Sequence, residues 1–223
     1  MPQQINKKIL LYLFLFIILG TFNNKKINKF DFPEIDSIQI DGLETDNGNF
    51  LKKIESLNLG NIFFLKNILL TELFESNNII EEYKIFKKYP SSLEVKVIET
   101  KFLALTKINQ KTFFVGSNGK LIEVKENLKK LPFIFGELDI NKFLSLKKII
   151  DESNLDFQEI KNLYFFPSGR WDIKNNRDIL IKLPQKNLLK VLNLSHHMIT
   201  NENFKNNKII DLRIYNNVIL TNE

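Results

Sequence analysis

The sequence predicts an α+β protein in three parts: an apolar N-terminal helix, a small strand–helix–helix–strand–strand unit, and a longer, mostly antiparallel β-domain with two helices. Three observations support this class. An uncharged apolar run stands near the N-terminus, five segments with strand or helix periodicity follow it, and a series of short strand patterns separated by Gly and Asn turns completes the chain. Because strands and helices do not alternate regularly, a mixed α+β fold is expected rather than a parallel α/β one.

Composition excludes several classes of protein. With 223 residues, 43% hydrophobic and 26% charged, the chain is neither a disordered tail nor a multi-span membrane protein. The absence of cysteine excludes disulfides, thiolate metal sites and cysteine nucleophiles. His196 and His197 are the only histidines, so a multi-histidine metal site is excluded. The net charge of +6 comes from scattered lysines with few arginines, so nucleic-acid binding is not expected.

The apolar run covers fourteen uncharged residues, Ile9–Phe22, and lysines flank it on both sides. A helix of this length is about 21 Å long, shorter than the ~30 Å hydrocarbon core of a bilayer. The residues after Gly20 lack the small-residue pattern of a signal-peptide cleavage site. The prediction is therefore a single uncleaved transmembrane helix over 9–22, extended by Ile5 and by lysines that reach to the interface.

The orientation of this helix is not decided by charge, because the lysines on its two sides balance. Length is the better guide, since a chain with no other apolar span most simply keeps its short end inside. Residues 1–8 are thus expected to be a short cytoplasmic tail, residues 23–34 a linker, and the remainder an exported body. This topology corresponds to a single-pass membrane protein with an exported body.

The body divides into two predicted units. In the first, residues 35–101, strand patterns end at Gly42, and apolar residues at 93, 95 and 97 alternate almost perfectly. The expected elements are strands over 35–40, 79–89 and 93–99, helices over 50–57 and 68–76, and a turn at 90–92.

The second unit, residues 102–223, begins with a hairpin whose strands, 112–115 and 120–124, flank an Asn-Gly pair. Further strands are expected within 131–136, over 160–166, 170–173 and 177–183, helices over 141–155 and within 184–198, and a terminal hairpin of 209–214 with 217–221.

Motifs in both units resemble the FtsQ/DivIB family of bacterial cell division proteins and its POTRA domain. They are Ile38–Gly42, Gly60–Phe63, Tyr89–Glu99, Leu131–Gly136, Gly169–Ile173, Ile179–Pro184 and Ile210–Arg213. The resemblance implies a POTRA domain over 35–101 and an FtsQ-type β-domain over 102–223. It also implies structural roles for Gly42, Gly60, Pro90, Trp171, Asp211 and Arg213.

Catalytic readings of the sequence are disfavoured, and no enzyme or cofactor is expected. Gly116–Lys120 lacks the remainder of a phosphate-binding loop. Ser195 has no nucleophile-elbow context, and Glu81 and Glu82 are neighbours on a strand, where they face opposite sides. Trp171 is expected to pack in the core, with Arg170 and Asp172 on the other face.

The C-terminal strand is the candidate binding site. Little sequence follows it, so it is a candidate sheet edge, whose backbone groups can pair with a partner strand. Asp211 and Arg213 project to one face of a strand and can pair, either to fix the hairpin or to contact a partner. The predicted partner-binding residues are Ile214, Tyr215, Asn217, Val218, Ile219 and Leu220.

Within the family resemblance, the matching strand receives a strand of FtsB, with FtsL bound alongside. The function this implies is a non-enzymatic scaffold at the division site that supports septum assembly through FtsB- and FtsL-like partners. One lipid-embedded helix and no small-molecule substrate complete the expectation. The alternative is a POTRA-containing component of protein secretion or outer-membrane assembly, and a wall-modifying enzyme is a weaker third reading.

Overall fold

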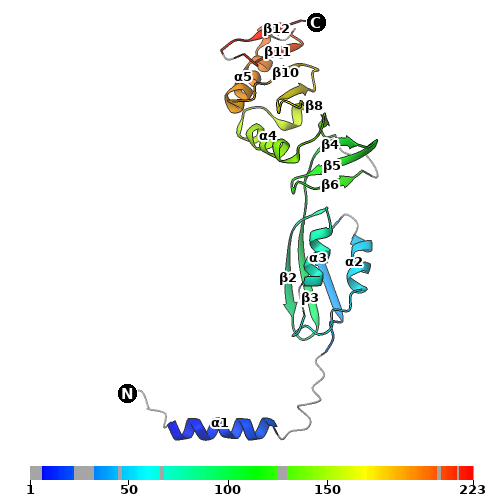
Figure 1. The fold of residues 1–223 in the computed structure, drawn as a ribbon, viewed down its shortest axis with the longest axis vertical. Helices are drawn as coiled ribbons and strands as arrows, with labels where there is room; N and C mark the ends of the chain where they lie inside the picture. The colour runs from blue at the N-terminus through cyan, green and yellow to red at the C-terminus, as the bar shows by residue number, and fades with distance from the viewer. Residues whose placement is uncertain are drawn as a thin grey trace.

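The computed structural model describes residues 7–22, 33–44, 47–65, 68–124, 130–204, 207–214 and 216–222, and the fold is mixed α and β as expected (Figure 1). Two units follow the N-terminal helix. The N-terminal unit comprises residues 33–101 and the C-terminal unit residues 102–222. They are stacked end to end along the long axis of the molecule (Figure 1).

Helix α1, Lys7–Phe22, contains the apolar run and begins two residues before its predicted start. Its 16 residues correspond to a length of about 24 Å. Within the described part of the chain, no helix combines the length and apolar character needed to cross a membrane. The predicted tail and linker fall mostly outside the described residues.

The N-terminal unit has the expected order of elements: β1 (Ser37–Asp41), α2 (Asn47–Glu55), α3 (Ile68–Ser76), β2 (Ile80–Lys88) and β3 (Ser92–Glu99). Its sheet has the order β1-β3-β2, in which β1 runs parallel and β2 antiparallel to the central strand. Both helices cover one face (Figure 1). The alternation predicted for β3 is confirmed, since Leu93, Val95 and Val97 are buried and pack with Ile54 and Phe74.

Two turns of this unit have glycine at positive φ. Gly42, which follows β1, has φ +88°, and a Cβ there would lie 2.2 Å from the carbonyl oxygen of Val97. Gly60 has φ +65°, a conformation that glycine adopts without steric cost. Pro90 lies in the turn between β2 and β3, where the Tyr89–Pro90 peptide bond is cis.

The C-terminal unit is built on one sheet of nine described strands in the order β12-β11-β10-β9-β8-β7-β4-β5-β6. Five neighbouring pairs are antiparallel and three are parallel, namely β4 with β7, β7 with β8, and β10 with β11. The strands are β4 (Phe102–Ile108), β5 (Lys111–Gly116), β6 (Leu121–Glu123), β7 (Phe133–Phe135), β8 (Ile160–Phe165), β9 (Trp171–Asn175), β10 (Leu180–Lys182), β11 (Ile209–Asp211) and β12 (Ile219–Thr221).

Helices α4 (Ile140–Glu152) and α5 (Leu188–Thr200) supply much of the core of this unit, with short 3-10 turns at Phe157–Glu159 and Glu202–Phe204. Trp171 is only 3% exposed, and its ring packs against Phe143 of α4 and Phe165 of β8. Asp139 caps α4 by accepting a hydrogen bond from the backbone N–H of Lys142. The core role expected for the tryptophan is confirmed.

Three sequence expectations need correction. Strand β4 was missed, because its hairpin to β5 turns at Asn109 and Gln110, both at positive φ and without the glycine that marks such turns. The strand expected over 177–183 shrinks to β10, since residues 176–178 form a turn that places Asp178 at φ +62°. The strands of the terminal hairpin are likewise shorter, so Val218 precedes β12 and Arg213 follows β11.

A turn of the C-terminal unit joins the two units. The side-chain amide of Asn118, between β5 and β6, donates to the carbonyl oxygens of Asn78 (3.0 Å) and Ile80 (3.1 Å). In return, the amide of Asn78 donates to the carbonyl oxygen of Leu121 at 2.9 Å. Ser117 also donates to the carboxylate of Glu81. The loop that resembled the end of a phosphate loop is therefore a polar junction between the units.

Candidate partner-binding edge

Strand β12 lies at one end of the nine-stranded sheet, with β11 as its neighbour (Figure 1). The pairing is antiparallel, with Ile210 opposite Leu220 and Asp211 opposite Ile219. The terminal hairpin expected from the sequence is therefore present, and its last strand is a sheet edge.

The backbone of β12 has one side that faces away from the sheet. The carbonyl oxygen of Thr221 accepts a hydrogen bond from the backbone N–H of Lys208 at 2.8 Å, so Thr221 directs its backbone groups toward β11. Adjacent residues of a strand direct these groups to opposite sides, which places the N–H and C=O of Leu220 on the outer side. No backbone partner for Leu220 on that side occurs among the described residues.

Apolar side chains surround this outer side. Ile214 is 55% exposed and Ile219 50%, with Val218 and Leu220 also exposed and Asn217 beside them. Tyr215, the remaining predicted contact, lies outside the described residues. A strand edge bordered by exposed aliphatic side chains is the arrangement that β-strand addition uses.

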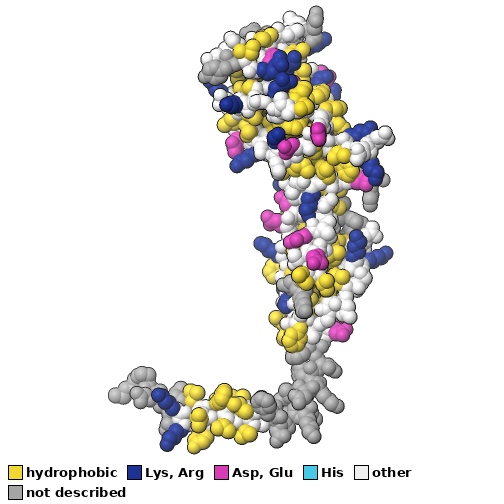
Figure 2. Space-filling view, viewed as in Figure 1, with side chains coloured by type: hydrophobic (Ala, Val, Ile, Leu, Met, Phe, Trp, Pro, Cys, Tyr) yellow, Lys and Arg dark blue, Asp and Glu magenta, His cyan; other side chains and the backbone are white. Residues whose placement is uncertain are grey.

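A groove of about 480 Å³ adjoins the edge. The start of α5 forms one wall, and residues 212–214 and 216–218 form the other. The apolar lining is Pro184, Val191, Leu194, Leu212, Ile214 and Val218. Lys186, Lys190 and Arg213 also line it. Hydrophobic and basic side chains lie close together at this end of the molecule (Figure 2). The groove is large enough to receive several side chains of a partner segment.

Sequence reasoning missed the contribution of α5 to this groove. Leu194 is 42% exposed, although α5 buries Leu192, Ser195, Met198 and Ile199 in the core. The signal was available, because an apolar residue off the buried stripe of an amphipathic helix needs another explanation. Residues 212–214 and 216–218 lie opposite this helix face, and only the fold brings them there.

Asp211 and Arg213 form an ion pair at the base of the edge. The Arg213 Nε lies 2.8 Å from Asp211 Oδ1, its Nη2 lies 2.5 Å from Oδ2, and the backbone N–H of Arg213 donates to Oδ1. The hydrogen bonds from Arg213 hold the pKa of Asp211 below its usual value. The pair closes the turn after β11, which supports the structural reading, while the Arg213 side chain is still partly exposed to the groove.

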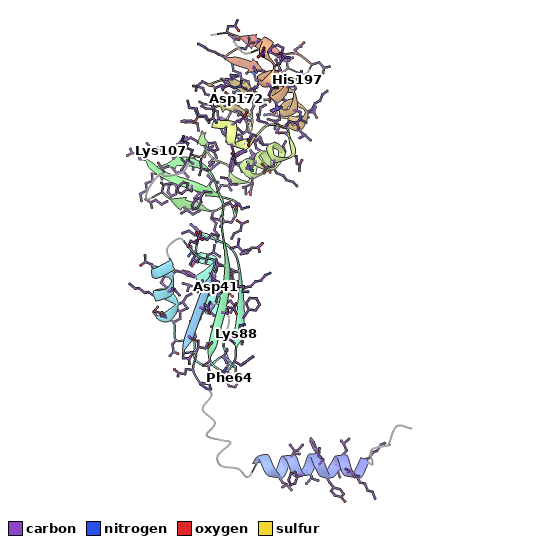
Figure 3. The ribbon with its side chains drawn as sticks, turned by 180° about the vertical axis from the view of Figure 1, so that it is seen from behind. Asp41, Phe64, Lys88, Lys107, Asp172 and His197 are labelled. Atoms are coloured by element: carbon purple, nitrogen blue, oxygen red, sulfur yellow. The ribbon has the colours of Figure 1, made fainter. Side chains whose placement is uncertain are left out.

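A second pair lies further inside the sheet. Asp172, which is labelled in Figure 3, is buried. It accepts a hydrogen bond from Nε of Arg170 at 3.2 Å. Burial raises the pKa of Asp172, although Arg170 and Arg213 oppose this shift. Lys182 stands between Asp172 and Asp211 in the strand register. A row of alternating charge thus runs from β9 in the sheet interior to β11, the neighbour of the edge strand.

The other predicted structural residues are not part of the edge. Gly42, Gly60 and Pro90 belong to turns of the N-terminal unit, and Trp171 is in the core of the C-terminal unit. Among the residues that the structure describes, no group of three or more His, Asp or Glu side chains is placed to hold a metal ion.

Comparisons with known proteins show which family this chain resembles. Residues 104–213 match the family model described as cell division protein FtsQ/DivIB, C-terminal. The chain is 28% identical to cell division protein DivIB of Clostridium botulinum, over 97% of this chain and 74% of the relative. It is 24% identical to cell division protein FtsQ of Rickettsia bellii, over 81% of this chain and 69% of the relative.

A solved structure was also found, the major extracytoplasmic domain of the trans isomer of DivIB from Geobacillus stearothermophilus. It is 17% identical, covers 44% of this chain and 88% of the domain, and aligns with a TM-score of 0.35.

The sequence matches define a bacterial cell division protein. More particularly, the chain belongs to the FtsQ/DivIB family. The resemblance seen in the sequence motifs is confirmed at this level, and the relatives favour division over the secretion alternative.

Proposed function

We propose that this protein is a non-enzymatic scaffold of the division machinery that holds FtsB- and FtsL-like proteins on the periplasmic side of the inner membrane. A strand of the FtsB-like partner adds to β12, and the partner's flanking side chains fill the groove beside α5. The FtsL-like protein binds alongside. The scaffold supports septum assembly by keeping these partners at the division site.

The observation that carries the proposal is the outer side of β12. The N–H and C=O of Leu220 point away from the sheet, and Ile219 beside it is half exposed. An exposed apolar edge is an aggregation hazard that proteins usually block with charge, a bulge or a covering loop. A partner strand would remove the hazard and satisfy the backbone groups. Family membership supplies the division context.

The membrane topology is part of the proposal. Helix α1, together with adjoining residues, anchors the chain as a single pass, with the N-terminus in the cytoplasm and both units in the periplasm. Its exposed apolar side chains and flanking lysines support this placement. The N-terminal unit, whose strand–helix–helix–strand–strand order resembles a POTRA domain, acts as the spacer between the membrane and the binding edge. Extraction of cell membranes with alkaline carbonate should leave the protein in the pellet.

The test removes one backbone donor from the outer side of β12. Leu220→Pro deletes the outward N–H but no described hydrogen bond to β11. Tagged full-length wild type and variant are captured from membranes, and bound proteins are identified by mass spectrometry. We expect wild type to retain FtsB- and FtsL-like proteins and the variant to lose them. Capture of neither by wild type would overturn the proposal.

The matched control is a proline on the other edge of the same sheet. Glu123 of β6 also directs its N–H outward, because the neighbouring Val124 N–H donates inward to Thr112. Glu123→Pro should therefore keep both partners. Since proline at 220 can also disturb the fold, Ile219→Lys provides a second variant that keeps every backbone donor. Retention of partners by both β12 variants would place the contact elsewhere.

A further inference from the structure

Three exposed aromatic side chains gather at one end of the N-terminal unit. Phe64 is 71% exposed, Tyr89 62% and Phe63 47%, and the rings of Phe63 and Tyr89 are 5.1 Å apart. Phe64 lies at the end of this unit that faces away from the C-terminal unit (Figure 3). We call these three residues the aromatic tip.

The aromatic tip has a defined structure, because hydrogen bonds connect three chain segments there. The backbone N–H of Ile35 donates to the carbonyl oxygen of Gly60, and the N–H of Asp36 donates to that of Ser91. The amide oxygen of Asn61 accepts from the N–H of Phe64, which fixes the loop that carries the two phenylalanines. The chain entry, this loop and the β2–β3 turn thus meet at one point.

Core packing does not account for the two phenylalanines. In the run Ile62–Leu65, the outer residues Ile62 and Leu65 are buried at 0% and 8% exposure and make the core contacts. Phe63 and Phe64 between them expose most of a large apolar surface instead. Exposed side chains of this size, gathered rather than scattered, mark an interaction surface.

The position of the tip along the chain limits what it can touch. Ten residues, 23–32, separate the end of α1 from Pro33, where the description of this unit begins. Fully extended, they span at most about 36 Å. With α1 anchored in the bilayer, the tip is therefore held close to the lipid surface, whereas the β12 edge lies at the opposite end of the molecule (Figure 1).

We propose that the aromatic tip rests on the lipid surface, with Phe63, Phe64 and Tyr89 in the headgroup region. This inference rests on the anchoring part of the proposed function. Aromatic rings favour the membrane–water interface, because their apolar body and, in tyrosine, a polar group suit that boundary. This contact orients the long axis of the molecule away from the membrane surface, so that the β12 edge lies far from the lipid.

Charge plays a small part in this contact. Lys88 is exposed but pairs with Glu94 at 2.9 Å, and the acidic Glu34 and Asp36 lie in the segment that enters the tip. Of these four groups one is basic and three are acidic, so they supply no net attraction to anionic lipid. We therefore expect the tip to bind a zwitterionic bilayer at least as well as an anionic one, with the aromatic rings supplying the affinity.

The experiment uses the absence of native cysteine. Full-length Phe64→Cys, labelled with the environment-sensitive dye NBD, is reconstituted into phosphatidylcholine vesicles with and without phosphatidylglycerol, in the absence of other proteins. The reference is the same labelled protein in detergent-free buffer, after proteolysis has removed α1. Relative to this reference, the NBD emission of the vesicle-bound protein is expected to rise about twofold or more, and nitroxide-labelled lipids should quench that emission. Ile98→Cys, 58% exposed near the far end of β3, is the control that should remain water-like.

Each outcome decides a separate claim. Vesicle-bound protein whose label at 64 behaves like the control overturns the tip contact but leaves anchoring and partner capture intact. Protein that does not sediment with vesicles overturns both the anchor and the tip contact. A label at 64 that responds only after FtsB- and FtsL-like proteins are added indicates a protein partner and also overturns the lipid contact. Partner capture at β12 is scored independently, in the pull-down.

Discussion

The two edge strands of the nine-stranded sheet differ in how well they are protected from pairing with another strand. At β6, the outward carbonyl oxygen of Leu121 accepts a hydrogen bond from the Asn78 side chain, and Glu123 pairs with Lys111 at 2.8 Å. At β12, exposed aliphatic side chains surround an outward backbone for which the described residues offer no partner. One edge is closed by the neighbouring unit and by charge, whereas the other is left open.

The comparison shows that an open edge is not a general property of this fold. The edge strand β2 of the N-terminal unit also carries exposed charged side chains, namely Glu82, Lys84 and Lys88. Proteins protect edges in this manner because unpaired strands invite association. Protection of β6 and β2 but not of β12 is the reason to assign binding to the C-terminal edge.

The largest expected effect is on partner affinity, when charged side chains are added to β12 in the way that charge protects β6. Val218→Lys with Ile219→Lys places two solvated charges at the edge, and each must be desolvated when a partner strand adds. We expect at least about a tenfold loss of affinity for the captured partner, or about 1.4 kcal/mol. Stability should change by no more than about 0.5 kcal/mol, because both side chains are exposed. Titration of the purified partner measures the first quantity and urea unfolding the second.

The reverse experiment opens β6. Asn78→Ala removes the donor to Leu121, so the outward carbonyl oxygen loses its partner and the junction between the units is weakened. A loss of about 1 kcal/mol in unfolding free energy is expected, together with concentration-dependent self-association in sedimentation experiments. The matched control is Asn217→Ala, which replaces an exposed asparagine in the β11–β12 turn. This substitution should change neither the unfolding free energy nor self-association. Equal stability of the two variants would contradict the assigned role of Asn78.

The charged row that leads to β12 predicts two opposite pH dependences. Asp211 has a pKa lowered by Arg213, so it stabilises the fold above its ordinary value of 3.8, and this stability is lost as the pH falls through the lowered value. Asp172 has a pKa raised by burial, so its charged form costs stability at neutral pH, and the cost disappears as the pH falls to 3.8.

Urea unfolding between neutral pH and pH 3 measures both pH dependences of stability. Asp211→Asn should lower the midpoint at pH 7, and its deficit should shrink toward pH 3. Asp172→Asn should have a urea midpoint at pH 7 equal to or higher than that of wild type, because asparagine is uncharged and still accepts the hydrogen bond from Arg170. This gain should shrink as the pH falls to 3. Deficits of the same sign and pH profile for both variants would show that the row does not behave as described.

The smallest effect is expected at the charge pair on β6. Glu123→Gln removes an ion pair whose side chains are 54% and 63% exposed, so water screens most of the attraction. Stability should change by less than about 0.5 kcal/mol, and partner capture should equal that of wild type. A marked loss of capture would move the binding surface from β12 toward β6.

Much of the local structure follows from the sequence. The alternation at 93, 95 and 97 correctly predicted the buried face of β3, and the Asn118-Gly119 pair correctly predicted the β5–β6 hairpin. Gly42 ends β1 where only a residue without Cβ fits. These features depend on residues close in the chain, so their physical causes can be seen in a short window of sequence.

Strand β4 shows where local reasoning fails. Its turn contains Asn109 and Gln110 at positive φ, a conformation that the chain accepts because the pairing of β4 with β5 on one side and β7 on the other holds it. No glycine marks the position. The free energy that maintains such a turn comes from the sheet, and the turn residues alone do not indicate it.

By itself, therefore, the sequence determined the family, the order of most elements, the core position of Trp171 and the pairing of Asp211 with Arg213. The tertiary structure decided which edges remain open. The bond from Asn78 to Leu121 joins residues 43 positions apart, and the groove beside β12 forms only where α5 meets residues 212–214 and 216–218. Contacts between distant segments depend on sheet order and packing, which hydrophobic periodicity does not encode.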